Sequence, residues 1–549
     1  MTPASSPSSK EDELQERRSV AVSALIFASG TLMSRILGLV RDMLTARYFS
    51  VDVRDAFLNG FRLPNLFRRI LGEGALSASF IPLFVEVLRG KKRGDPAAAE
   101  TRARDLVCGV FSILMSISIT LSLLATIFMD DILRVILSGD EYMSVPGKFD
   151  LTVKLGRIMF SFLILISLYA FFMAVLNSVK KFAMTAIAPC FFNIALITAA
   201  LISPRFQAPE LVLAWSVIVG GILQMGILIP AVIKSGFFPH FSFQWNSPDL
   251  TRVLKSVLPG AFGMSIMQIT TVVNMHFASY LPKGSHSYLY YADRILELPL
   301  SMFVVSIGAA LLPTLSRYWA EENRSAMAEA INHYIALIVF VAFPAALGMF
   351  VLAHPITEIL FMGREFKYSD AVATAQIIQV YSFSVVVSAG VRILAQGFYA
   401  IQNTWFPAVA GSVALICHVI FAYTLSKAFG LNGLAIASVT SATVNLLMLG
   451  AAYNSWVGSL QLLRLLKKFA WFLICGAVMV AILLCYEPLL HFVSGKFPGA
   501  RVFSLFTIIF VGGGAYMLTA HVLKISEYKE TIATFMKKKA PAYFSRPPR

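Results

Sequence analysis

Long runs of apolar residues, separated by short polar stretches, recur along the whole chain. A run of about twenty apolar residues is long enough for a helix to cross a bilayer. Windows of that length predict about fourteen membrane-spanning helices, which lie near residues 20–47, 55–88, 104–129, 151–178, 183–203, 210–234, 256–281, 286–316, 327–353, 371–400, 405–426, 431–455, 467–487 and 501–523. The pattern therefore predicts an all-α polytopic membrane protein.

The chain also repeats itself weakly. The segment LNSVKKFAMTAIA, which begins at Leu176, aligns with FYAIQNTWFPAVA, which begins at Phe398. LAWS at Leu213 aligns with LAIA at Leu434, and both pairs are offset by about 221 residues. Six spans per repeat is an even number, so both copies keep the same orientation in the membrane. Parallel repeats of this kind are typical of transporters with a central cavity.

The repeat predicts how the chain is divided. We expect two six-helix lobes around a central cavity, at residues 19–237 and 238–456. Two further spans, within residues 457–525, lie outside the repeat. Residues 1–18 are expected to form a disordered cytoplasmic tail without a cleavable signal peptide, and residues 526–549 a basic cytoplasmic tail.

Composition supports a membrane protein and argues against other classes. Hydrophobic residues make up 57% of the chain and charged residues 14%, with a mean hydropathy of +0.72. A soluble domain carries about 25% charged residues. The net charge of +16 does not indicate a nucleic-acid partner, because the basic residues are spread over many short loops. The sequence contains no Walker A loop, HExxH motif or metal-spaced Cys/His cluster, so we expect a transporter rather than an enzyme, with no cofactor and no bound metal.

Alternate loops differ in charge, which predicts the orientation. Loops on the side of the N-terminus are basic, and the opposite loops are acidic. The basic set includes Lys91, Lys92, Arg93, Lys180, Lys181, Lys234, Arg464 and Lys467, and the acidic set includes Asp130, Asp131, Asp140 and Glu141. Basic loops remain on the cytoplasmic side, so both termini are expected there.

Several charges lie inside the predicted spans. A charge at the centre of a bilayer costs roughly 2.5–3.5 kcal/mol on insertion scales, so such residues normally face a cavity. The first span contains Arg35, Arg41 and Asp42. At 100° per residue, Arg35 and Asp42 share one face of the helix and Arg41 points elsewhere.

The second and eighth spans carry more charge than the first. In the second, one sector of roughly 80° contains a polar stripe flanked by Arg68. The stripe consists of Asp55, Asn59, Arg62, Arg69 and Glu73. Pro64 predicts a kink or break beside it. The eighth span contributes Asp293, Arg294 and Glu297, and the tenth contributes Arg392.

Two interpretations of these charges are open. In the first interpretation the charges have a structural role: they form ion pairs that hold helices together, or they are arginines whose side chains reach the membrane interface. This interpretation suits Arg41, Arg47 and Arg54, which lie near span ends. Alternatively, the surplus of arginine over acid marks a cavity that binds an anion. The planar guanidinium fits phosphate and carboxylate oxygens, so a diphosphate or a carboxylate is the expected ligand.

The segment SRILGLVRDMLTARYF…FRLPNLFRRILGEGALSASFIP, from Ser34 to Pro82, resembles the N-terminal signature of the MurJ/MviN family. YYADRILELP, from Tyr290, and QGFYAIQNTWFP, from Gln396, resemble further motifs of this family. These are the lipid II flippases of bacterial cell-wall synthesis, in the multidrug/oligosaccharidyl-lipid/polysaccharide exporter superfamily. Two six-helix lobes followed by two extra helices is also the arrangement of this family.

The resemblance implies roles for individual residues. The family's cavity arginines correspond to Arg35, Arg41, Arg68 and Arg294, and a basic residue is usual at the position of Arg392. Its functional acids correspond to Asp42, Asp55, Glu73 and Glu297. We keep both Arg68 and Arg69, because a break near Pro64 would change the phase of the helix. Some members are thought to bind sodium through spans seven and eleven, but span eleven here has no Asp, Glu or Asn.

The resemblance implies a flippase of the bacterial inner membrane. It would move undecaprenyl-diphosphate-linked peptidoglycan precursor, lipid II, to the outer leaflet by alternating access, with the acids as gating ion pairs. Its partners would be lipid II, membrane lipids and enzymes of cell-wall synthesis. The alternatives are a flippase for another polyprenyl-linked glycan, such as an O-antigen or capsule intermediate, and a non-transporting scaffold. A scaffold needs no buried arginines, and an exporter of cationic drugs should present acids instead.

Overall fold

A computed structural model describes residues 29–70, 77–90, 96–242, 247–300, 305–494 and 499–535. Within these ranges the regular elements are all helices, and no β-strand is present. Nine helical segments in the described ranges are long and apolar enough to cross a membrane. The predicted all-α polytopic fold is therefore confirmed. The count of fourteen spans stays a prediction, because the first, second and eighth predicted spans run into residues outside the described ranges.

The chain forms two compact units. Unit 1 is Met1–His286 together with Gly363–Phe366, and unit 2 is Ser287–Met362 together with Lys367–Arg549. The two lobes predicted from the repeat, with a boundary after residue 237, are defined by sequence duplication, whereas these units are defined by compactness. The lobes therefore remain a prediction.

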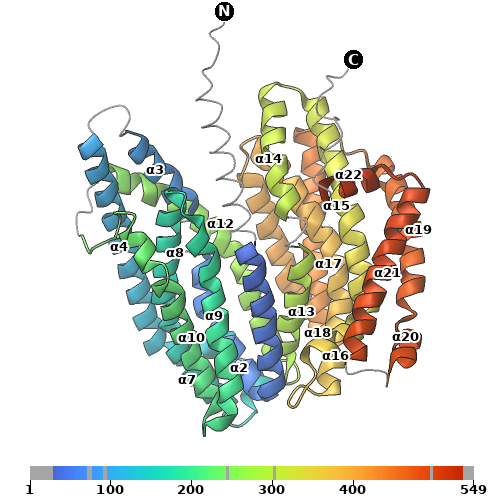
Figure 1. The fold of residues 1–549 in the computed structure, drawn as a ribbon, viewed down its shortest axis with the longest axis horizontal. Helices are drawn as coiled ribbons and strands as arrows, with labels where there is room; N and C mark the ends of the chain where they lie inside the picture. Colours follow the sequence, from blue (N-terminus) through green and yellow to red (C-terminus); the bar gives the residue numbers. More distant parts are fainter. Residues whose placement is uncertain are drawn as a thin grey trace, which may run out of the picture. The chain divides into compact units, whose positions relative to one another are not determined.

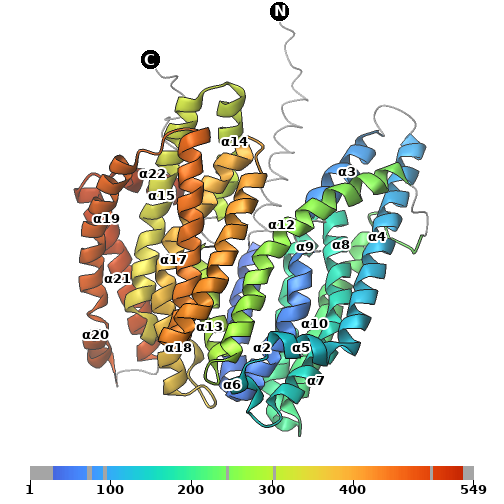
Figure 2. The same cartoon turned by 180° about the vertical axis from the view of Figure 1, so that it is seen from behind.

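Unit 1 begins its described part with a helix over residues 29–48. The helices that follow are α2 (Val51–Phe67), α3 (Ser77–Gly90), α4 (Pro96–Ile127), α5 (Met129–Ile136), α6 (Asp140–Met143), α7 (Lys148–Phe160), α8 (Phe162–Ser178), α9 (Phe182–Ile202), the 3-10 turn η2 (Ser203–Arg205), α10 (Pro209–Gly226), α11 (Ile229–Ile233) and α12 (Pro248–Ser279). α7 and α8 follow one another along a single apolar segment, Lys148–Ser178, and Figures 1 and 2 show α9 and α10 running alongside it.

Aromatic side chains form much of the core of unit 1. Phe61 of α2 contacts Phe162 of α8 and Phe192 of α9, with ring centroids 6.0 and 6.2 Å away. Phe162 and Phe192 also contact each other at 5.2 Å. Aromatic rings bury large apolar areas, so this three-ring contact holds α2 against α8 and α9. α2 is buried on all sides from Arg54 to Phe61, so Arg54 and Asp55 are held in the protein interior.

Unit 2 contains the remaining helices. They are α13 (Ser285–Pro299), whose first two residues belong to unit 1, α14 (Val305–Ala320), α15 (Arg324–Val351), α16 (Ala353–Phe361), α17 (Tyr368–Ala400), α18 (Trp405–Trp456), α19 (Leu462–Leu483), α20 (Tyr486–Val493), α21 (Ala500–Val522) and α22 (Ser526–Phe535). Several match the predicted spans to within a few residues, for example α15, α17 and α21.

The 52-residue segment α18 covers two predicted spans and consists of two helices joined at a kink. Its backbone leaves the helical region at Gly430, where φ is 56° and ψ is −131°. A positive φ is costly for residues with a Cβ, and glycine adopts it freely. The predicted division between spans at 405–426 and 431–455 therefore coincides with a real break in the helix.

The two C-terminal spans pack within unit 2. Tyr516 of α21 donates a buried hydrogen bond of 3.0 Å to the backbone oxygen of Phe340 in α15. Phe340 also contacts Phe472 of α19 at a centroid distance of 5.3 Å. Figure 1 shows α19 and α21 side by side. These helices thus share a core with α15.

Candidate functional site

The first described helix carries an ion pair between adjacent residues. Arg41 Nη2 lies 2.7 Å from Asp42 Oδ1, and the two side chains are only 11% and 4% exposed. Arg41 Nη1 donates to Asn193 Oδ1 of α9 at 3.2 Å, and Asn193 Nδ2 donates to the backbone oxygen of Ser34. The expectation that Arg41 points away from Asp42 is wrong, because the long arginine side chain curves back to its neighbour.

Arg35 lies on the same helix and is half-buried. It makes no hydrogen bond or ion pair with any other residue that the structure describes. The guanidinium group donates several hydrogen bonds that fit phosphate and carboxylate oxygens, so Arg35 is suited to contact an anionic ligand.

The polar stripe of α2 divides into a buried part and a half-buried part. Asp55 and Asn59 are fully buried, and Arg62 is half-buried. After Phe67 the backbone widens into a π-helical turn over residues 68–70, which follows Pro64 by one turn. The irregularity predicted beside Pro64 is present.

Arg68 and Arg69 lie in this π-helical turn and are both half-buried. Arg68 Nε donates to Asn65 Oδ1 at 2.7 Å. A π turn shifts the phase of the helix, so a regular wheel cannot choose between these two arginines. Glu73 lies outside the described residues.

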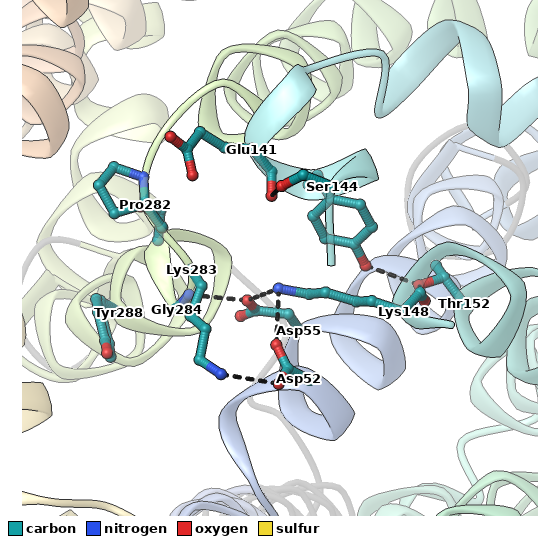
Figure 3. Close-up of polar contacts among 12 residues, drawn as sticks. Asp52, Asp55, Glu141, Ser144, Lys148, Thr152, Pro282, Lys283, Gly284 and Tyr288 are labelled. Carbon is teal, nitrogen blue, oxygen red and sulfur yellow. Dashed lines mark hydrogen bonds and ion pairs between the residues drawn. The ribbon is translucent and has the colours of Figure 1, made fainter. Parts of the chain in front are cut away.

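The buried end of the stripe belongs to a network of four charges (Figure 3). Asp55 is fully buried and accepts hydrogen bonds from Lys148 Nζ at 2.8 Å and from the backbone N–H of Gly284 at 2.9 Å. Asp52, one helical turn earlier, lies 3.0 Å from Lys283 Nζ and 3.4 Å from Lys148 Nζ. Two lysines thus neutralise two aspartates, which leaves no net charge for an external ligand.

Aromatic groups line this network. The ring of Tyr142 lies 4.6 Å from Lys148 Nζ, and its hydroxyl hydrogen-bonds Thr152 at 2.7 Å. Burial, and secondarily the negative charge of Asp55, raises the pKa of Tyr142 above its usual value, so its phenol stays protonated. The ring of His286 packs edge-on against Tyr142 at 5.2 Å.

Lys148 and Lys283 were not identified from the sequence. Lys148 is separated from Asp55 by 93 positions, so no local pattern connects them. One signal was available: Lys148 lies in a predicted outer loop, where lysine is uncommon, and α2 begins with two aspartates that need a cation.

The predicted site residues of unit 2 are more exposed. Arg294 Nη1 lies 3.1 Å from Glu297 Oε2, and these side chains are 29% and 52% exposed. Asp293 and Arg392 are exposed as well. These residues remain accessible to ligand. Among the described residues, no three His, Cys, Asp or Glu side chains are grouped closely enough to hold a metal ion.

Comparisons with known proteins agree with this helical fold. Residues 45–509 match the family described as "Lipid II flippase MurJ". A relative from Bdellovibrio bacteriovorus, named "Probable lipid II flippase MurJ", is 38% identical over 510 residues, which cover 93% of this chain and 96% of the relative.

Two solved structures share the fold. One, titled "Lipid II flippase MurJ, inward closed conformation", has a TM-score of 0.74 at 24% identity and covers 92% of this chain and 100% of its own. The other is an inward-facing multidrug resistance MATE family transporter of the MOP superfamily, with a TM-score of 0.66 at 13% identity, covering 81% of this chain and 99% of its own. Because the family model spans most of the sequence and the relative matches along nearly its whole length, this chain belongs to the lipid II flippase MurJ family.

Proposed function

We propose that this protein moves lipid II, the undecaprenyl-diphosphate-linked precursor of peptidoglycan, from the inner to the outer leaflet of a bacterial plasma membrane. The observation that carries the proposal is the 38% identity, over 93% of the chain, to a relative named as a lipid II flippase. The helical membrane fold and the arginines in its first helices support a transporter of an anionic lipid.

The charge balance of the first two helices favours an anionic substrate. Residues 29–70 contain seven arginines but only three aspartates. Asp42 is paired with Arg41, and Asp52 and Asp55 are paired with lysines from elsewhere in unit 1. In the sequence of these two helices arginine exceeds aspartate, and an excess of positive charge attracts an anionic group such as a diphosphate.

We assign the substrate's diphosphate to Arg35, Arg41, Arg62, Arg68 and Arg69 of unit 1 and to Arg294 and Arg392 of unit 2. Asp42, Asp55, Glu73, Asp293 and Glu297 act as gating or ion-pairing acids. In alternating access, Asp42 and Glu297 hold Arg41 and Arg294 when no substrate is bound, and the diphosphate competes for these two arginines, whereas Asp55 pairs with Lys148. Membrane potential acting on such charges supplies about 2.3 kcal/mol per charge per 100 mV.

The proposed orientation places both termini in the cytoplasm of the bacterial cell. The support is the alternation of basic and acidic loops, with Lys180 and Lys181 on the cytoplasmic side and Asp140 and Glu141 on the outer side. Lipid II is made at the cytoplasmic surface, so its headgroup would meet the basic side first.

The test is depletion of this protein in its own bacterium, followed by measurement of lipid II in the outer leaflet with a probe added from outside. Wild type should restore the signal, and Arg35→Ala should lower it about tenfold or more. Loss of one charge-assisted hydrogen bond costs about 1.5–3 kcal/mol, and 1.4 kcal/mol corresponds to tenfold.

Two control variants sharpen this test. Arg35→Lys keeps the positive charge and should retain part of the activity. Arg134→Ala removes an exposed arginine that pairs with Asp130 on α5, and it should behave as wild type. Normal outer-leaflet lipid II after depletion, with no second flippase present, would overturn the substrate assignment. Activity of Arg35→Ala equal to wild type would overturn the binding site.

A further inference from the structure

A four-residue segment, Gly363–Phe366, packs as part of unit 1 although the chain on both sides of it belongs to unit 2. We call it the 363–366 strap. It lies between the end of α16 at Phe361 and the start of α17 at Tyr368. The chain therefore leaves unit 2 at Met362, contributes four residues to unit 1, and returns at Lys367.

The strap is held by a buried cation and an aromatic ring. Phe366 is 0% exposed, and the guanidinium carbon of Arg54 lies 4.7 Å from the centre of its ring. Arg54 is also 0% exposed and donates from Nη1 to the backbone oxygen of Ala46 at 3.2 Å. Arg54 thus does not reach the membrane interface, which was one sequence-based interpretation of it. A cation–π contact is strongest when both groups are shielded from water, as here.

Backbone contacts fix the rest of the strap. The N–H of Glu365 donates to the backbone oxygen of Arg47 at 3.1 Å, and the N–H of Gly363 donates to the oxygen of Phe366 at 3.1 Å. A Cβ at Gly363 would lie 2.6 Å from Cγ of Arg47, so a larger residue does not fit there. The strap therefore packs closely against the other residues of unit 1, with no space for a side chain at position 363.

Residues in the first turn of α2 contact the chain near each of its passages between the units. Arg54 holds Phe366, next to the passages at 362/363 and 366/367. Its neighbours Asp52 and Asp55 hold Lys283 and Gly284, close to the passage at 286/287 (Figure 3). Three charged side chains of one helical turn, Asp52, Arg54 and Asp55, thus hold residues that lie beside these passages.

The length of the chain limits how far unit 2 can move while the strap is seated. Only Lys367 separates Phe366 from α17, and two residues span at most about 7 Å. A larger displacement of this end of α17 from unit 1 must pull Phe366 off Arg54. Alternating access requires displacements between parts of a transporter, and any displacement of the start of α17 beyond this length unseats the strap.

The geometry points to a latch: the 363–366 strap is seated in one state of the transport cycle and released in another, with Arg54 and Phe366 as positioning residues for flipping. This inference rests on the proposed function, because it assumes a cycle of transport. If the inference is right, a strap that cannot be released stops transport. The aromatic face of Phe366, and not only its size, then sets the ratio of the seated to the released state.

The first experiment locks the strap with a disulfide between Arg47→Cys and Gly363→Cys. The Cβ of residue 363 would lie 2.9 Å from Cβ of Arg47, so a shift of about 1 Å reaches the usual separation in a disulfide. Cys417 and Cys485, which are not buried, are first replaced by serine. Flipping of lipid II is then measured in reconstituted vesicles, oxidised and reduced, with Arg47→Cys alone as the control.

We expect the oxidised double variant to lose flipping at least tenfold and to recover on reduction, while the control is unaffected by oxidant. Full activity of the cross-linked protein would show that the strap stays seated, and would overturn the latch while leaving the flippase proposal intact. Failure of the reduced protein and of wild type to flip lipid II would instead overturn the proposed function.

A second experiment separates the latch from simple packing. Phe366→Tyr keeps the aromatic face for Arg54, and Phe366→Leu keeps an apolar side chain without it. We expect Phe366→Tyr to flip within about twofold of wild type and Phe366→Leu to differ from wild type by about tenfold, at equal amounts of folded protein. Equal flipping by the two variants would contradict a role for the cation–π contact.

Discussion

Asp55 and Lys148 form an ion pair in which both side chains are almost completely removed from solvent, at 0% and 1% exposure. Asp55 is further satisfied by the backbone N–H of Gly284. A buried pair of this kind adds little net stability compared with apolar residues, but removing one partner leaves an uncompensated charge. The pair therefore acts mainly to specify which segments come together.

This pair gives a prediction at the residue scale. Lys148→Met should lower the free energy of unfolding by about 3–5 kcal/mol, because it leaves the Asp55 carboxylate buried without a cation. The double variant Lys148→Met/Asp55→Asn should be clearly less destabilised, because the asparagine oxygen still accepts from Gly284. Unfolding in detergent, analysed as a double-mutant cycle, measures the difference.

Lys283→Met is the matched control for that cycle. Lys283 pairs with Asp52 but is 56% exposed, so its loss should cost less than about 1 kcal/mol. If Lys148→Met proves as mild as Lys283→Met, the network of Figure 3 is not buried as described.

At the scale of elements, the short helix α22 is attached to unit 2 by charges rather than by a long apolar face. Glu527 is 1% exposed and pairs with Lys468 of α19. Glu530 Oε2 lies 2.7 Å from His333 Nε2 of α15. Burial by itself raises the pKa of Glu527, but the hydrogen bond and charge of Lys468, helped by Ser526, outweigh it, and the net pKa lies below the ordinary value of 4.5.

The lowered pKa predicts how the docking of α22 depends on pH. The folded protein binds this proton less readily than the unfolded chain, so Glu527 contributes stability above pH 4.5 and loses it as the pH falls further. We expect the protection of α22 amides from hydrogen exchange, corrected for the intrinsic effect of pH on exchange, to be lower at pH 4 than at pH 7.

The variant Glu527→Gln is the control for this effect, because it cannot titrate. Its α22 should exchange faster than wild type at pH 7, and the additional acceleration between pH 7 and pH 4 should be smaller, once the intrinsic effect of pH on exchange is removed. An unchanged pH response in Glu527→Gln would assign the effect to another group, of which His333–Glu530 is the nearest pair.

At the scale of the whole molecule, the alternation of loop charge predicts which loops face each side of the membrane. Ser144 and Lys181 are both exposed and lie in loops of opposite predicted sides. In a background with Cys417 and Cys485 replaced by serine, Ser144→Cys should react with an impermeant maleimide in intact spheroplasts. Lys181→Cys should react only after permeabilisation, because positively charged loops stay inside. The reverse pattern would invert the proposed topology.

Much of the fold could be predicted from local sequence. The limits of α9, α15, α17 and α21 follow from apolar runs of spanning length, and the break at Gly430 follows from a short interruption between two such runs. The polar stripe of α2 was also recognisable, because helical periodicity places Asp55, Asn59 and Arg62 on one side. The sequence could not decide between Arg68 and Arg69, because the π-helical turn breaks that periodicity.

By itself the sequence determined the class of molecule, the positions of the apolar helices, the excess of arginine and the membership of the family. Each of these depends on neighbouring residues, on totals or on aligned motifs. Which side chains meet depends on tertiary packing: Lys148 pairs with Asp55, Lys283 with Asp52, and Arg54 contacts the ring of Phe366. Residues of these pairs are far apart along the chain and are brought together by helix packing and by the path of the chain between units. A charge inside a span shows that a partner or ligand is needed, and packing decides which one it finds.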